Sequence, residues 1–91
     1  MTKQEIVNEL NKMFPAEDKK YPVAFIVDGQ VMVTSESYST EAPYTIVDYW
    51  QEGHSESYDD FGVSTELNAW LEKHGLMAEW AHAGGVHIFP A

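Results

Sequence analysis

The chain has 91 residues, 44% of them hydrophobic and 13% aromatic, with a net charge of −10 and no cysteine. This length predicts a single globular domain over 1–91 that buries a hydrophobic core. The absence of cysteine excludes disulfides, thiolate catalysis and cysteine-based zinc sites, and it is typical of the reducing cytoplasm. No apolar run approaches the roughly 18–20 residues of a membrane helix, and the first ten residues lack the pattern of a signal peptide.

The charge is distributed unevenly along the chain. Residues 1–20 contain four acids and four lysines, so they carry no net charge, whereas residues 21–91 contain eleven acids and only Lys73. Arginine is absent, and neutralising phosphates requires clustered basic side chains, so direct binding to nucleic acid is not expected. An anionic membrane surface would also repel the chain. If charge selects a partner, that partner is a basic protein.

The first predicted element is a helix over 3–14. Thr2 and Glu5 form a T-x-x-E capping box at its start, and apolar residues recur along it at helical spacing. Pro15 ends the helix, and a charged connector follows.

The pattern then changes to that of strands. Asp28-Gly29 is the strongest hairpin signal in the chain, and it predicts a β-hairpin over 22–34 with a two-residue loop that pairs Val27 with Gln30. Both faces of this hairpin are apolar. We therefore expect central strands that are covered on both sides, at least in part.

A third strand is predicted over 44–51, which is rich in β-branched and aromatic residues. An acidic loop over 52–62 and a second helix over 65–74 follow. Ser64 can cap this helix, and Gly75 supplies the left-handed residue that ends it.

The last segment, 77–90, is predicted to form a second hairpin that turns at Gly84-Gly85. This register gives four pairs: Ala83 with Val86, His82 with His87, Ala81 with Ile88, and Trp80 with Phe89. The resulting order α-β-β-β-α-β-β predicts an α+β fold, with two helices packed on a small antiparallel sheet of about five strands. Two short helices need not cover both faces, so an apolar face could remain open to a partner or to a second copy of the chain.

His82 and His87 are the candidate metal ligands. As direct cross-strand neighbours, their Cβ atoms would lie about 5 Å apart. Two imidazoles so placed could bind a transition metal, with His54, His74 or a carboxylate as the third ligand. The alternatives are an ordinary half-exposed pair and a pH response, because charging both rings would set like charges opposite each other.

An acidic tract between residues 36 and 66, which contains no base, forms the candidate partner-binding surface. Its members are Glu36, Glu41, Asp48, Glu52, Glu56, Asp59, Asp60 and Glu66. They could line one surface at spacings that resemble a phosphate backbone, and such a surface could occupy the basic nucleic-acid groove of another protein, as small acidic inhibitors of phages and mobile elements do. This is a likeness of composition alone. The carboxylates over 52–60 could instead hold Ca²⁺ loosely, act as acid and base, or form a plain solvated loop.

The sequence is compatible with three functions. We favour a small acidic, non-catalytic binding protein, without a cofactor, that engages a basic surface of a partner protein. The second hypothesis is a small metal-dependent or acid–base enzyme built around His82 and His87, although the sequence contains no nucleophile elbow and no phosphate loop. The third is a homodimeric structural protein that buries an open sheet face.

Overall fold

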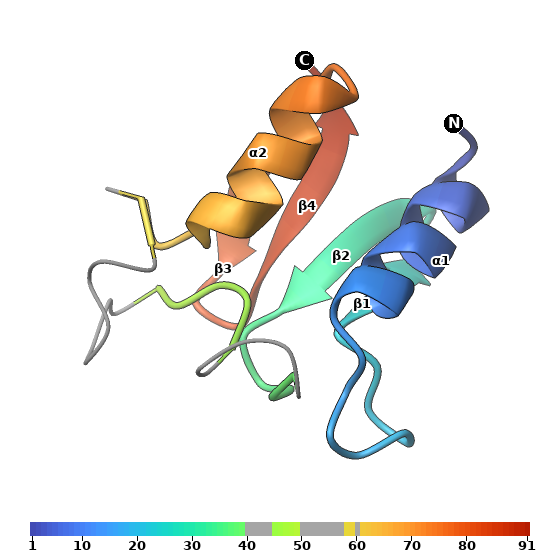
Figure 1. The fold of residues 1–91 in the computed structure, drawn as a ribbon, viewed down its shortest axis with the longest axis vertical. Coiled ribbons are helices and arrows are strands. Elements are labelled where there is room, and N and C mark those ends of the chain that lie inside the picture. The colour runs from blue at the N-terminus through green and yellow to red at the C-terminus, as the bar shows by residue number, and fades with distance from the viewer. Residues whose placement is uncertain (40–44, 50–57, 60) are drawn as a thin grey trace.

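The computed structural model describes residues 1–39, 45–49, 58–59 and 61–91. The elements are α1 (Lys3–Met13), β1 (Ala24–Val27), β2 (Gln30–Thr34), α2 (Thr65–Lys73), β3 (Leu76–His82) and β4 (Gly85–Pro90). The strands form an antiparallel sheet in the order β1-β2-β4-β3, and both helices lie on the same face of it (Figure 1). The α+β class with two helices on an antiparallel sheet is confirmed, with four strands in the described ranges rather than about five.

Helix α1 begins at the predicted capping box. The Thr2 hydroxyl accepts a hydrogen bond from the Glu5 backbone N–H at 3.1 Å, and the Glu5 carboxylate accepts one from the Thr2 N–H at 2.8 Å. These hydrogen bonds, from the Thr2 backbone first and its side chain second, lower the pKa of Glu5 below its ordinary value. The helix ends at Met13, close to the predicted boundary, and Phe14 caps it while staying almost fully buried.

The first hairpin has the predicted register, with Val27 opposite Gln30 and Phe25 opposite Met32. Asp28 and Gly29 have φ of 50° and 75°, the left-handed pair that a two-residue hairpin loop requires. The expected cover on both sides is wrong. β1 is an edge strand, and because both helices pack on one face, Phe25 and Val27 stay 36% and 43% exposed on the other.

The third predicted strand is not formed over the part of it that the structure describes. Residues 45–49 make only isolated bridges, such as Val47 with Val63, and the remainder of 44–51 lies outside the described residues. Ile46 and Val47 are both completely buried in the core. A regular strand sends consecutive side chains to opposite faces, so a segment that buries both of them in one core is not extended in that way.

Helix α2 is confirmed at its predicted start. The Ser64 side chain accepts from the Leu67 backbone N–H at 3.1 Å, and Leu67 and Leu71 are buried against the sheet. The helix ends at Lys73, and Gly75 has the expected left-handed φ of 65°. No helix in the described ranges is long and apolar enough to cross a membrane.

The second hairpin exists, but its predicted register is wrong. The loop is residues 83–84, one position earlier than expected, and a bulge between Trp80 and His82 shifts the pairing further. Trp80 therefore lies opposite Val86 instead of Phe89. Two features favour the observed register. It places Trp80 on the helix-covered face, where Trp80 packs on the core. It also makes Gly85 a strand residue, paired with Thr34.

Gly85 suits that strand position because β2 and β4 approach closely there. A Cβ at Gly85 would lie 2.9 Å from the Val33 carbonyl oxygen and 3.2 Å from the Met32 methyl carbon. Glycine removes this conflict, so the pair Thr34–Gly85 can form at the end of the β2–β4 ladder.

The hydrophobic core lies between the helices and one face of the sheet. Its sheet residues alternate along each strand, and Ala24, Val31, Val33, Val86 and Ile88 face the helices. The intervening residues of the same strands face away from both helices.

Candidate binding surfaces

The face of the sheet opposite the helices carries apolar side chains on all four strands, beside the polar Gln30, Thr34 and Glu79 that alternation also places there. We call it the open face and define it by six residues: Phe25, Val27, Met32, Met77, His87 and Phe89. Each of them neighbours a core or core-packed residue in its strand, so alternation places all six on the far side. The register aligns Phe25, Met32, His87 and Glu79 in one row from β1 to β3.

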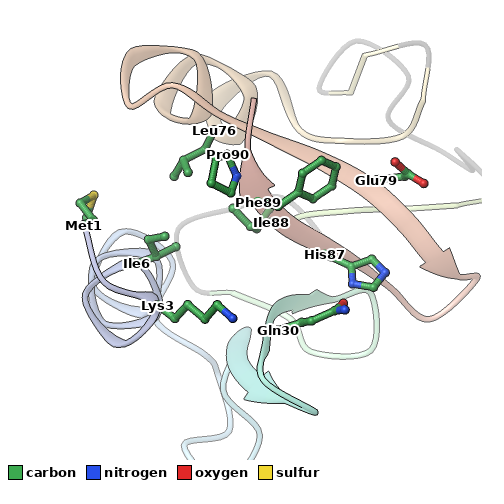
Figure 2. A pocket seen from close by; sticks show the side chains of 10 residues that line it. All are labelled: Met1, Lys3, Ile6, Gln30, Leu76, Glu79, His87, Ile88, Phe89 and Pro90. Carbon is green, nitrogen blue, oxygen red and sulfur yellow. The ribbon is translucent and has the colours of Figure 1, made fainter.

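A groove of ≈ 510 Å³ lies at one end of the open face (Figure 2). It forms because β2 pairs with β4 only from Val31 onward, opposite Ile88, while β4 continues to Pro90. Side chains from the N-terminal part of the chain, including Lys3 and Ile6, close it on the other side, and its lining is mostly apolar. The groove therefore connects the open face with the gap between α1 and the end of β4.

The described polar side chains of the groove come from three strands and from α1. His87 and Glu79 lie opposite each other on adjacent strands, and Gln30 and Lys3 complete the described polar lining. Among the described residues that line the groove there is no serine, threonine or cysteine. Lys3 already donates its ammonium group to the Gly29 carbonyl oxygen.

A second hollow of ≈ 500 Å³ lies at the other end of the open face. Phe25 and Thr34 form its floor from the sheet side, and Tyr21, Lys20 and Glu36 contribute from the neighbouring loops. The open face is thus flanked by two hollows, and each contains one lysine and one glutamate.

The acidic tract is only partly described, and the described acids play different roles. Glu41, Glu52, Glu56 and Asp60 lie outside the described residues. Asp59 is used internally, because its Oδ1 accepts from the backbone N–H groups of Phe61 and Val63 at 2.9 and 3.0 Å, and its Oδ2 accepts from Asn68. It orders the segment that leads into α2.

The remaining described acids lie on two sides of the sheet. Glu36 is exposed and lines the second hollow beside the open face. Glu66 is exposed on α2, which covers the opposite face, and Asp48 is half-buried in the segment that pairs with Gly62 just before that helix. The structure therefore groups Asp48 and Glu66 near the start of α2 and separates them from Glu36. Glu72, which lies outside the predicted tract, adds a further exposed acid on α2.

The predicted pairing of His82 with His87 is wrong. His87 lies opposite Glu79, and His82 lies opposite Gly85, where its Nδ1 accepts a hydrogen bond from the Gly84 N–H at 2.9 Å. His74 stacks on Trp70 with ring centroids 4.5 Å apart, and His54 lies outside the described residues. Among the described residues, no group of three or more histidines and carboxylates is placed to hold a metal ion. The geometry that suggested a metal site is absent.

Comparison of the chain with known protein families, with curated proteins and with solved structures found no match. The candidate surfaces therefore rest on their own geometry. Reasoning from the sequence missed the groove and the contributions of Met77 and Phe89. The sequence did predict an apolar face left open, because both faces of the first hairpin are apolar and the chain offers only two predicted helices.

Proposed function

We propose that this chain is a small acidic, non-catalytic binding protein that engages a basic surface of a partner protein. The observation that carries the proposal is the charge of the part of the chain beyond residue 20, which has eleven acids and a single base. On the α2 side, Glu66 and Glu72 are exposed. Asp48 belongs to the segment that hydrogen-bonds to Gly62, just before the start of α2. A surface of this charge attracts basic proteins and repels polyanions.

The partner class that suits such a surface best is a protein with a basic groove for nucleic acid. In this proposal the acidic side occupies that groove as an inhibitor, and the chain itself binds neither nucleic acid nor an anionic membrane. The absence of cysteine supports a cytoplasmic location. In the described part of the chain, the groove is lined by no hydroxyl or thiol nucleophile, which supports a binding role over nucleophilic catalysis.

The experiment that tests the proposal compares two variants with equal changes in charge. Glu66→Gln/Glu72→Gln neutralises two exposed acids on α2, and Glu9→Gln/Glu17→Gln neutralises two exposed acids in the N-terminal part. The immobilised full chain and both variants are used to capture proteins from a lysate, with elution by a salt gradient. A basic protein so identified is then purified and titrated against each of the three by calorimetry.

We expect the α2 variant to weaken binding at least tenfold and the N-terminal variant to leave it nearly unchanged. Binding should also weaken steeply between 50 and 300 mM salt, because exposed charges are screened beyond a Debye length of about 8 Å at physiological ionic strength. The proposal is contradicted if the dissociation constant changes neither with salt nor in either variant. Direct binding of labelled DNA or RNA to the chain contradicts it as well.

A further inference from the structure

We propose that the chain forms a symmetric homodimer in which the open faces of two sheets stack against each other. This proposal is independent of the partner on the α2 side, because α2 lies on the other face of the sheet (Figure 1). It commits the open face to one occupant, a second copy of the chain.

The first argument is the apolar surface that the fold leaves uncovered. Phe25, Val27 and Met77 are 36%, 43% and 43% exposed, and they lie on both edge strands of the described sheet. Met32 lies between them and is already buried at 7% exposure. A sheet with one apolar face packed on helices and a second apolar face is stable when another layer covers that second face. Two sheets stack at about 10 Å through interdigitating side chains.

The second argument is charge complementarity at the borders of the open face. The groove at one end carries Lys3 and Glu79, and the hollow at the other end carries Lys20 and Glu36. Among the described residues that line them, both borders thus carry both signs of charge, although Glu17 and Asp18 line an adjoining hollow beside Glu36. A uniformly basic partner would meet a lysine at each end, whereas a second copy carries both a lysine and a glutamate at each end. In a two-fold interface each such pair occurs twice.

The third argument concerns the repulsion between two acidic chains. Stacking the open faces directs both copies of α2, with Glu66 and Glu72, outward on opposite sides of the dimer. Two sheets about 10 Å apart and a helix layer of about 10 Å on each side then separate these acids. This separation exceeds the Debye length of about 8 Å at physiological salt, so repulsion between the α2 acids of the two copies is largely screened.

The available area predicts a weak dimer. Four strands spaced at about 4.8 Å, each about six residues long at 3.3 Å per residue, give a flat area of roughly 380 Å² per copy. For both copies this is about 760 Å² before side-chain relief is counted, which places the interface at the small end of the size range. We therefore expect a dissociation constant in the micromolar range and a dimer that depends on protein concentration.

The test is sedimentation analysis of the full chain between about 1 and 300 µM in 150 mM salt. The weight-average mass should rise with concentration from 10.3 kDa toward twice that value. Met77→Glu places a charge on the open face and should raise the dissociation constant at least tenfold. Phe61→Glu is the matched control, because Phe61 is 74% exposed but lies in the segment before α2, and it should dimerise like the native chain. Val27→Glu, on the opposite edge strand, provides a second open-face variant if Met77→Glu fails a circular-dichroism check of folding.

Three results would overturn the dimer: a native chain that stays monomeric up to 300 µM, open-face variants that dimerise normally, or a control that dissociates. Salt separates this proposal from the function proposed above. Association through an apolar face should persist or strengthen between 50 and 500 mM salt, whereas binding of a basic partner should weaken, so either proposal can fail without the other.

Discussion

Among the described glycines, Gly62 is the one at which an added Cβ would meet the closest neighbouring atom. Its φ is +83°, and its carbonyl oxygen accepts a hydrogen bond from the Asp48 N–H at 2.7 Å. A Cβ at this position would lie 2.1 Å from the Asp48 carbonyl oxygen and 3.3 Å from the ring of Trp80. The hydrogen bond between Asp48 and Gly62 holds residues 45–49 against the segment before α2, and these residues include the core side chains of Ile46 and Val47.

Gly62→Ala is therefore expected to destabilise the protein by more than its backbone conformation alone would cost. Gly29→Ala is the matched control, because its φ is +75° but nothing lies within 4 Å of the added Cβ. The left-handed conformation costs an ordinary residue about 1–2 kcal/mol, which should be the whole effect at Gly29. At Gly62 the clash with a backbone oxygen should raise the loss to about 3–4 kcal/mol. Urea unfolding of the two variants measures both losses, and equal losses would show that the close contact with Asp48 does not constrain the fold.

At the scale of whole elements, one side chain of α1 takes the place of a missing strand. Asn11 donates its side-chain amide to the Ala24 carbonyl oxygen at 2.9 Å and accepts from the Ala24 N–H at 3.0 Å. Ala24 belongs to the edge strand β1 and is only 1% exposed, so its outward backbone groups have little access to water. The Asn11 side chain satisfies both groups and blocks this end of the edge against another strand.

Asn11→Ala should destabilise the protein by about 2–3 kcal/mol, because an unsatisfied buried polar group costs roughly 1–3 kcal/mol and two groups lose their partner here. Asn8→Ala, three residues earlier on α1, removes an exposed side chain that bonds only to Gln4 in the described contacts, and it should change stability by less than about 0.5 kcal/mol. Thermal or urea unfolding provides the measurement. If the two variants lose the same stability, water replaces Asn11 at the edge and the side chain is not needed there.

The elements that could be predicted from the sequence are those whose signals are local. The capping box at Thr2 and Glu5 and the Asp28-Gly29 loop act within a few residues, and both were located correctly. The turn of the second hairpin is not located correctly, because a turn at residues 83–84 and a turn at Gly84-Gly85 are similar in local sequence. Contacts across the sheet, at Gly85 with β2 and at Trp80 with the core, decide between them.

The candidate sites follow the same division. An open apolar face could be expected from the composition of the first hairpin, but its groove depends on where β2 stops pairing with β4, which no local pattern encodes. The histidine pair failed because a loop shifted by one residue and a bulge together place Glu79, three positions before His82, opposite His87. A site built on one cross-strand register therefore disappears with a small error in that register.

At the scale of the molecule, the excess of negative over positive charge destabilises the folded state. The chain has a net charge of −10 and a radius of gyration of 11.7 Å, so its acids are confined to a small volume. At 10 mM salt the Debye length is about 30 Å, and charges across the whole molecule repel each other. Unfolding moves these charges apart, so repulsion destabilises the native state at low ionic strength.

Raising sodium chloride from 10 to 500 mM should therefore raise the unfolding temperature, because screening removes repulsion that the folded chain feels more strongly than the unfolded one. Each 1 kcal/mol of restored stability corresponds to about 4–8 °C in a protein of this size. Scans at one low protein concentration keep any self-association constant. The variant Glu66→Gln/Glu72→Gln carries two fewer negative charges, so it should melt higher than the native chain at 10 mM and gain less from salt. A fall in the unfolding temperature on adding salt would mean that attractive ion pairs outweigh repulsion, and that the excess of acids is already balanced locally in the folded chain.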